Sequence, residues 1–187
     1  MKRGPAYREF LIKLRREWAI ETGVLERLYA LSEGATKTLI EQGLDAALLS
    51  HGDTDRAPAD VMALIRDQHA VVEGLYQFIE GERPLSMSYV NELHQALTAH
   101  QAAYDAKNTL GQAVMPAMQR GVFKKLKNNV DLEDGTSFEF CPSEQVASEM
   151  DALLRMHADH VSRGVPPDVQ AAWLHHRLAT ASGWLVP

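Results

Sequence analysis

Apolar side chains recur at steps of three and four residues along most of this chain, and this spacing limits the fold more than any other feature of the sequence. Such spacing places apolar groups on one face of an α-helix, where they can pack in a core. In the first segment, residues 7–31, the apolar positions include Phe10, Leu11, Leu14, Trp18, Val24, Leu25, Leu28 and Leu31. We predict a helix over residues 7–31. Gly23 marks a break or a special role in it, because glycine costs about 1 kcal/mol relative to alanine inside a helix.

The same pattern and its end signals predict further helices along the chain. Their expected ranges are 36–49, 58–80, 87–103, 143–160 and 168–180. Pro58 suits a first helical turn, and Ser86 and Ser143 are the expected N-caps of the helices that follow them. No repeat at a fixed period and no low-complexity linker interrupts the series. The fold class is therefore predicted to be mainly α, as one domain.

Residues 120–142 break the helical pattern. Two short apolar and aromatic segments flank a loop rich in Asn, Asp and Gly, with the turn sequence Glu133-Asp134-Gly135. Asp and Gly tolerate the positive φ values of tight turns. We predict a β-hairpin here, as the one β element of the chain.

Composition excludes several classes of function. The net charge of −6 argues against a general nucleic-acid binder, which carries a basic face. Cys141 is the single cysteine, so neither an intramolecular disulfide nor a cysteine-based zinc site can form. No apolar run reaches the roughly 20 residues of a membrane span, and the N-terminal segment lacks the apolar region of a secretory signal. A cytoplasmic location is expected.

The sequence contains few side chains that could form a metal site or a catalytic site. His157 and His160 share a helix face, and Glu149 or Asp151 could join them on a metal ion, but no HExxH or paired ExxH motif is present. Solvated or capping histidines are the favoured interpretation. The same holds for His175 and His176, which point about 100° apart on a helix. Cys141 lacks the pattern of an activated thiolate and is expected to be a small packing residue.

The basic cluster of Lys124, Lys125 and Lys127 has two interpretations. It could meet phosphates or an acidic partner, or it could protect an exposed strand edge from unwanted pairing. No nucleotide-binding glycine motif and no GxSxG nucleophile motif occurs in the sequence. The residues alone therefore predict a helical domain with one hairpin and no complete active site.

A resemblance to a known family adds to this interpretation. Four segments resemble parts of the Fic (Fido) family, and they occur in the family's order over nearly the whole chain. These segments are residues 18–43, 78–101, 121–154 and 171–180. The first resembles the N-terminal region of self-inhibited members and the second the early core helices. The third resembles the flap hairpin and the helix after it. The last, AAWLHHRLAT, resembles the helix that leads into the catalytic loop.

The resemblance implies a Fic-like helical domain with one flap hairpin and, for active members, transfer of AMP from ATP to a protein hydroxyl with Mg²⁺. The family's catalytic loop, His-Pro-Phe-x-x-Gly-Asn-Gly-Arg, would follow Thr180, where this chain continues ASGWLVP. We therefore expect a domain truncated before its catalytic loop, with no catalytic residue of its own. Such a chain is not expected to bind ATP and Mg²⁺ productively or to transfer AMP.

The resemblance also implies an inhibitory motif, Ser or Thr, three residues, Glu, then Gly or Asn. Thr22 to Glu26 matches the first five positions, and Arg27 departs from the sixth. The family logic makes Glu26 the inhibitory carboxylate, which pairs with the arginine of the catalytic loop, and Thr22 its partner on the helix. The implied organisation is an inhibitory N-terminal region over residues 1–57 and an incomplete core over residues 58–187.

In the family, the flap aligns an extended segment of the target protein by strand addition. Residues 121–126 and 137–140 would then dock a protein substrate. The implied docking residues are Gly121, Val122, Phe123, Lys124, Lys125, Phe138 and Phe140.

Two other functions remain open at this stage. The chain could be a non-catalytic helical interaction module built on the Fic scaffold, or a helical metalloprotein that uses His157 and His160. We also expect an under-covered apolar face around Trp173, Leu174 and Leu178, which would favour self-association and low stability.

Overall fold

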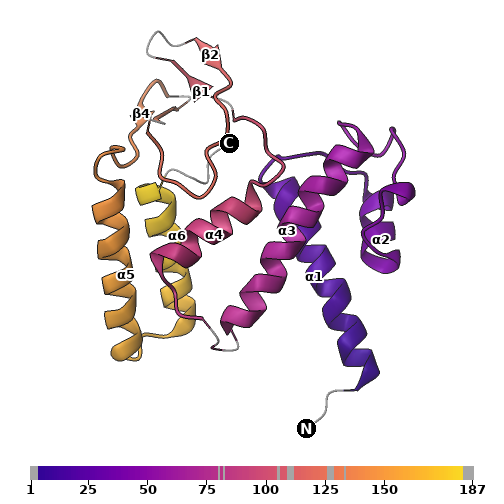
Figure 1. Ribbon diagram of the computed structural model, residues 1–187, viewed down its shortest axis with the longest axis horizontal. Coiled ribbons are helices and arrows are strands. Elements are labelled where there is room, and N and C mark those ends of the chain that lie inside the picture. The colour runs from indigo at the N-terminus through magenta and orange to yellow at the C-terminus, as the bar shows by residue number, and fades with distance from the viewer. Residues whose placement is uncertain are drawn as a thin grey trace. The chain divides into compact units, whose positions relative to one another are not determined.

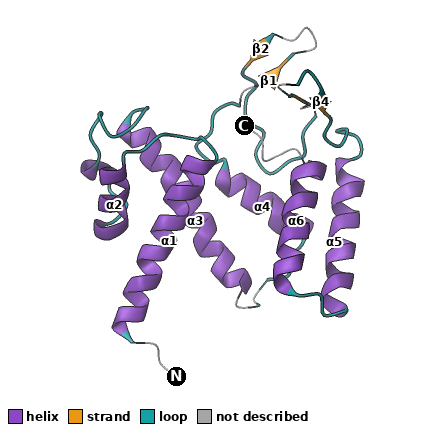
Figure 2. Ribbon diagram, turned by 180° about the vertical axis from the view of Figure 1, so that it is seen from behind, coloured by secondary structure: helices purple, strands orange, loops and turns teal. Residues whose placement is uncertain are grey.

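The computed structural model describes residues 4–79, 81, 83–104, 106–108, 112–125, 129–132 and 134–182, and this part of the chain is mainly helical (Figures 1 and 2). The chain forms two compact units. The first comprises Met1–Pro84 and Gln95–Ala102, and the second comprises Leu85–His94 and Ala103–Pro187. The expected functional division into an inhibitory region, residues 1–57, and a core, residues 58–187, is not tested by these two units and stays a prediction.

The first unit is built on helix α1 (Pro5–Leu25), which packs against α2 (Glu33–Gln42) and α3 (Pro58–Ile79). A short 3-10 helix, η1 (Ala46–Leu48), lies between α2 and α3 in the sequence and contacts both of them. The side chains of the unit's core come from all three α-helices and are at most 1% exposed; they are Ile20, Leu39, Val61, Met62 and Ile65. Burying such groups supplies the main stabilising free energy.

Helix α1 ends six residues before the end predicted from the apolar spacing. Leu28 N–H donates to the carbonyl of Gly23 at 2.9 Å, and Arg27 N–H donates to the carbonyl of Val24 at 3.0 Å. These two bonds, with a left-handed residue at Arg27 (φ 55°), form a Schellman cap. Leu28 and Leu31 therefore reach the core from the segment after the helix, not from a longer helix.

Substitution of Arg27 by Gly is expected to raise the free energy of unfolding by about 1 kcal/mol. A side chain other than Gly or Asn is disfavoured in the left-handed conformation that the cap imposes. For a protein of this size, the melting temperature should rise by about 2–4 °C. Arg27→Ala is the matched control, because it removes the charged side chain and keeps the Cβ. An equal gain in both variants would assign the effect to the side chain's charge.

The predicted helix 36–49 is replaced by the shorter α2 and the separate η1. Ser32 Oγ accepts from Ala35 N–H at 3.2 Å, so α2 begins at Glu33. Gly43 follows the helix with φ 126°, which stops helical continuation before residue 49. By contrast, α3 matches the predicted 58–80 closely, with Pro58 as its first residue.

The second unit is organised around the neighbouring helices α5 (Val146–Ser162) and α6 (Pro167–Ser182) (Figures 1 and 2). Val146, Met150 and Leu153 of α5 are at most 1% exposed and form its core. Trp173, Leu174 and Leu178 of α6 are partly buried against this core, so α5 covers the apolar face that we expected to be under-covered.

The first part of α4 (Met87–Leu97) belongs to the second unit, and Ser86 caps it as predicted, since Ser86 Oγ accepts from Tyr89 N–H at 3.2 Å. Ser143 was wrongly predicted to cap α5. Its hydroxyl bonds to the Glu144 carboxylate, and Gln145 takes the cap position without a side-chain bond.

The second unit holds two antiparallel hairpins, one of which the sequence did not reveal. Strands β3 (Val130–Asp131) and β4 (Ser137–Phe138) pair within the predicted region 120–142. The Asp134 carboxylate closes their turn by accepting from both the N–H and the hydroxyl of Thr136, at 2.9 and 2.6 Å. The other hairpin joins β1 (Ala106–Lys107) and β2 (Ala113–Val114), so the prediction of a single β element was wrong. None of the described helices has the length and apolar character that crossing a bilayer requires.

Candidate functional site

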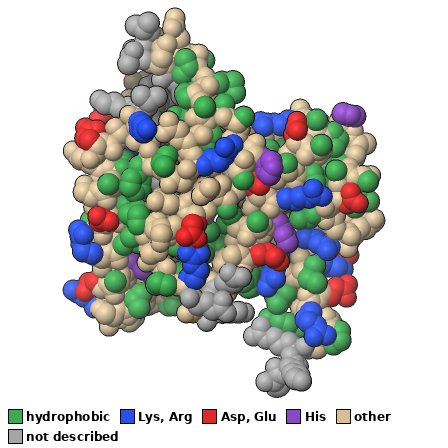
Figure 3. All heavy atoms as spheres, in the orientation of Figure 1, with side chains coloured by type: hydrophobic (Ala, Val, Ile, Leu, Met, Phe, Trp, Pro, Cys, Tyr) green, Lys and Arg blue, Asp and Glu red, His purple; other side chains and the backbone are tan. Residues whose placement is uncertain are grey.

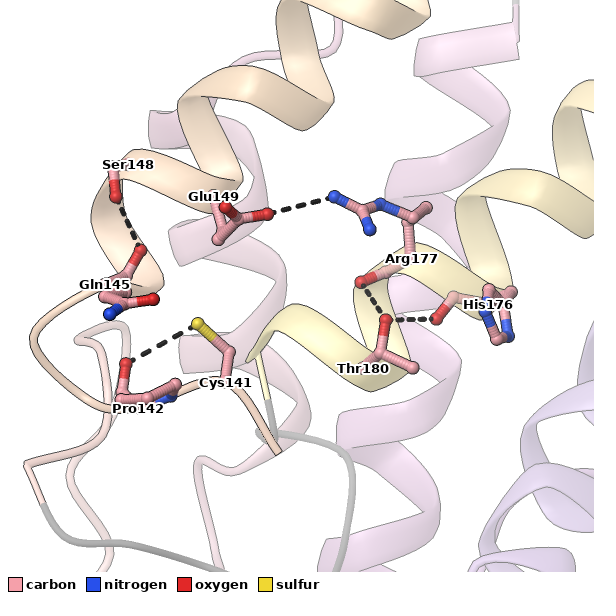
Figure 4. Close-up of polar contacts among 8 residues, drawn as sticks. All are labelled: Cys141, Pro142, Gln145, Ser148, Glu149, His176, Arg177 and Thr180. Carbon is pink, nitrogen blue, oxygen red and sulfur yellow. Dashed lines mark hydrogen bonds and ion pairs between the residues drawn. The ribbon is translucent and has the colours of Figure 1, made fainter. Parts of the chain in front are cut away.

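The end of α6 meets the segment that leaves the β3–β4 hairpin. Cys141 N–H donates to the carbonyl of Thr180 at 3.2 Å, which ties the two segments together. Beside this bond lies an open cavity of about 240 Å³ (Figure 4). Its lining residues are Cys141, Pro142, Gln145, Glu149, Arg177 and Thr180. They bring together the hairpin exit, the start of α5 and the last turns of α6.

An ion pair spans this cavity between the two helices. Arg177 Nη2 donates to Glu149 Oε2 at 3.0 Å, and both side chains are partly exposed (Figure 4). Arg177 Nε is buried and has no hydrogen-bond partner among the described residues. The cation of Arg177 is thus largely compensated by a carboxylate, which weakens its attraction for a second anion.

Cys141 lies in this cavity without the features of a nucleophile. Burial raises the pKa of its thiol, and the negative charge of Glu149 acts in the same direction. The thiol therefore stays protonated at neutral pH, and its Sγ donates to the carbonyl of Pro142 at 3.5 Å. This agrees with the packing role expected from the sequence.

The expected docking residues of the flap occupy different environments. Val122, Lys125 and Phe138 are exposed, with Phe138 43% exposed on β4. Phe123, in contrast, is partly buried against the α5–α6 core.

Lys124 and Phe140 form a pair at the base of the hairpin. The Lys124 ammonium lies 5.7 Å from the centre of the Phe140 ring, and burial lowers the pKa of Lys124. Phe140 also packs edge-on against Phe138, with ring centres 4.9 Å apart. Residues 121–125 form no strand, and the first strand of the hairpin, β3, begins at Val130; residue 126 lies outside the described residues.

His94 anchors the start of the segment in which we expected the flap, a role that the sequence analysis missed. Gly121 N–H donates to His94 Nδ1 at 2.9 Å, and the His94 side chain is buried on α4. Accepting this bond requires a lone pair on Nδ1, so the imidazole is neutral. Burial lowers the pKa of His94, in agreement with that state. The sequence did contain a signal for the burial of His94, because His94 follows Val90 by four residues and precedes Leu97 by three, which places it on the apolar face of the helix.

Acidification is expected to destabilise the protein through His94. Its folded pKa lies below the unfolded value of about 6.5, so the unfolded chain binds more protons in that window. Stability should therefore fall as the pH drops through about 6.5 and level off below the folded pKa. The slope is at most about 1.4 kcal/mol per pH unit for one group.

Urea unfolding at several pH values between 7.5 and 5 would measure this slope. His94→Asn is the matched variant, because its amide oxygen accepts a hydrogen bond without titrating. The pKa values of His69 and His157 are also lowered by burial, so the variant should retain a smaller slope. An unchanged slope in His94→Asn would contradict the role of His94.

The histidines of α5 do not assemble a metal site with acidic neighbours. His160 packs edge-on against Trp173, with ring centres 4.6 Å apart, and the Nδ1 atoms of His157 and His160 are buried without hydrogen-bond partners. Within the described ranges, no group of three His, Cys, Asp or Glu side chains is arranged to hold a metal ion. His175 and His176 are exposed on α6.

Thr22 and Glu26 lie on the exposed end of α1, in the first unit. Glu26 N–H donates to the carbonyl of Thr22 at 2.9 Å, so the two residues are one helical turn apart. The next position, Arg27, is left-handed. Gly and Asn, the residues expected at this position from the resemblance, adopt this conformation more readily than arginine.

Comparison with known proteins supports the fold. No model of a known protein family matches the sequence, and no curated protein matches it. The structure is similar to a Fic domain containing signaling protein from Bacteroides thetaiotaomicron, with a TM-score of 0.63 and 20% identity over 90% of this chain. The match covers 55% of that chain, so the present chain spans about half of its length. The predicted mainly helical, Fic-like fold is confirmed.

Proposed function

We propose that this chain is the scaffold and target-docking part of a Fic-type protein adenylyltransferase. The observation that carries the proposal is the junction of the hairpin exit with the last turn of α6, through Cys141 and Thr180, on a Fic-like fold. In the resembled family, the residues after this helix carry the catalytic base. The junction would put those residues beside the flap that aligns the target hydroxyl.

The docking element in this proposal is the edge of the β3–β4 hairpin. In the described part of the chain these strands pair only with each other, which leaves backbone groups for an added strand. Phe138 offers an exposed aromatic surface beside that edge. Exposed apolar side chains at Val122 and Leu132 lie in the same stretch of sequence. An extended segment of a protein substrate fits this combination of backbone and apolar contacts.

In this proposal the described residues do not bind ATP and Mg²⁺ productively. Arg177 in the cavity is already paired with Glu149, and no carboxylate cluster for a metal ion occurs among the described residues. The 187 residues also contain no His-Pro-Phe-x-x-Gly-Asn-Gly-Arg segment. We therefore assign no catalytic step to this chain, and its proposed role is to dock and position the target.

Incubated with ATP, Mg²⁺ and candidate proteins, the 187-residue chain is expected to transfer no AMP, as measured by labelled nucleotide and intact mass. Extending the chain after Ser182 with the catalytic loop and following helices of a Fic protein should create transfer. The same extension with its motif histidine replaced by alanine is the control. Labelling by the 187-residue chain alone, or equal labelling by both extensions, would contradict the proposal.

The proposed inhibitory role of Glu26 can be tested in the same extended chain. Glu26→Gln removes the carboxylate that would engage the loop arginine, so transfer should increase at least about tenfold, the effect of one lost charge-assisted bond. Glu21→Gln is the matched control, because Glu21 is also exposed on α1. Equal increases in both variants would exclude a specific role for Glu26.

The alternative function is a protein-interaction module that keeps the Fic scaffold without chemistry. The exposed side chains Val122, Leu132 and Phe138 favour it as much as they favour substrate docking. A stable complex that is lost on substituting Lys124 and Lys125, together with an inactive extended chain, would support this alternative. A cytoplasmic location and self-association stay predictions under both functions.

A further inference from the structure

A buried carboxylate on α3 and an exposed imidazole in the segment after α4 form a pair in the first unit. Asp67 on α3 accepts from the His100 ring Nδ1 through Oδ1 and from the His100 backbone N–H through Oδ2, both at 2.8 Å. The Asp67 side chain is 8% exposed and the His100 side chain is 60% exposed. The carboxylate is thus shielded, while the ring that it holds faces solvent.

This pairing fixes the protonation pattern of the ring. A carboxylate oxygen only accepts hydrogen bonds, so the bonded Nδ1 of His100 carries a hydrogen. In the neutral imidazole the lone pair then resides on Nε2, the nitrogen on the other side of the ring. The hydrogen bond from the His100 backbone N–H to Asp67 Oδ2 fixes the position of the carboxylate. The fixed carboxylate in turn holds the His100 ring in its orientation. In the Ser-His-Asp triad a carboxylate bonded to Nδ1–H likewise holds the imidazole in one tautomer and stabilises its positive charge, although that histidine acts as a general base.

The other histidines of the described chain lack this arrangement. His94 uses Nδ1 as an acceptor and is buried, and the Nδ1 atoms of His157 and His160 are buried without a partner. His69 is partly buried, and His51, His175 and His176 are exposed; among the described residues, no carboxylate bond to any of these four rings is found. His100 alone combines an exposed ring with a fixed tautomer in this set.

We propose that His100 is a phosphoryl-acceptor site, modified at Nε2 by an activated phosphoryl donor such as a phosphoanhydride or phosphoramidate. The Nε2 lone pair attacks phosphorus and forms an N–P bond, while the bond from phosphorus to the leaving group breaks. The leaving group departs with the electrons of that bond. The ring gains positive charge during the attack, and the Asp67 carboxylate stabilises that charge through the Nδ1–H bond. The Nδ1 proton can then pass to solvent.

The test is reaction of the folded 187-residue chain with potassium phosphoramidate at pH 8, followed by peptide mass spectrometry under alkaline conditions, which preserve phosphohistidine. His51, His175 and His176 serve as exposed internal references. We expect His100 to react about tenfold faster than each of them, the rate effect of one charge-assisted bond to the developing cation. Equal or slower reaction at His100 would overturn the proposal.

Two further measurements isolate the contribution of Asp67. In Asp67→Asn, reaction at His100 should fall to the rate of His51, with the fold checked by circular dichroism. A synthetic peptide of residues 95–104 provides a reference that needs no folded variant, because it contains His100 without Asp67. Reaction of His100 in the protein at the peptide's rate would show that exposure alone governs its reactivity and would overturn the proposal.

Discussion

Substitution of Gly23 by Ala is expected to lower the free energy of unfolding by about 3 kcal/mol. A Cβ at this position would lie 2.2 Å from the hydroxyl oxygen of Tyr29 and 2.4 and 2.6 Å from two of its ring carbons. Tyr29 is 3% exposed and its hydroxyl donates to the carbonyl of Ile20 at 3.1 Å, so the ring cannot move aside freely. Overpacking of this kind costs about 1–3 kcal/mol, and loss of the hydrogen bond adds about 1 kcal/mol.

A double-mutant cycle separates this contact from the helix propensity of glycine. In a Tyr29→Leu background the ring and hydroxyl are absent, so Gly23→Ala should become stabilising by up to about 1 kcal/mol. Gly74→Ala is the control within a helix, because a Cβ there meets nothing within 4 Å. Urea unfolding followed by circular dichroism gives all the free energies. A large loss that persists without the Tyr29 ring would contradict the steric explanation.

Gly23 also shows what the sequence could and could not predict. Its cost inside a helical pattern indicated a special role, but the partner, Tyr29, was not identifiable because it follows a chain reversal. That reversal depends on Arg27 in a left-handed conformation. Sequence signals for such a cap rest on Gly or Asn, so an arginine there concealed the end of α1 and extended the predicted helix to residue 31.

The other helices and strands were predicted accurately where the local sequence contains a strong start, end or turn signal. Helix α3 was placed within one residue at its end because Pro58 marks its start and a Gly- and Pro-containing loop follows it. Strands β1 and β2 were missed because each has two residues, too few to show alternation. The β3–β4 turn was found because its Asp-Gly sequence has a specific conformational meaning.

The candidate site was less predictable because its contacts join distant positions. His94 and Gly121 are 27 positions apart, and Asp67 and His100 are 33 apart. Such pairs depend on how the helices pack against one another, and the spacing of apolar residues does not determine that packing. The sequence did predict the packing role of Cys141, while the docking role of the hairpin stays a prediction. It could not show that Phe123 turns into the α5–α6 core.

Substitution of Leu153 by Ala is expected to lower the free energy of unfolding of the second unit by about 3 kcal/mol. Leu153 is 1% exposed in the core of α5, where removing a leucine side chain loses both its transfer free energy and its packing contacts. The α6 side chains Trp173 and Leu174 pack against this core, so their support is weakened directly. For a chain of this length the melting temperature should fall by about 10 °C.

Val161→Ala is the matched control for this substitution, because Val161 lies on the same helix and is 56% exposed. Fluorescence of a variant that keeps only Trp173 reports on the second unit, and a variant that keeps only Trp18 reports on the first. The Leu153→Ala substitution should lower the midpoint reported by Trp173, whereas Val161→Ala should leave it within about 0.5 kcal/mol of the parent. A midpoint unchanged by Leu153→Ala would mean that α5 does not hold the core to which the flap and the end of α6 are attached. The proposed alignment of a docked target beside α6 would then lose its physical basis.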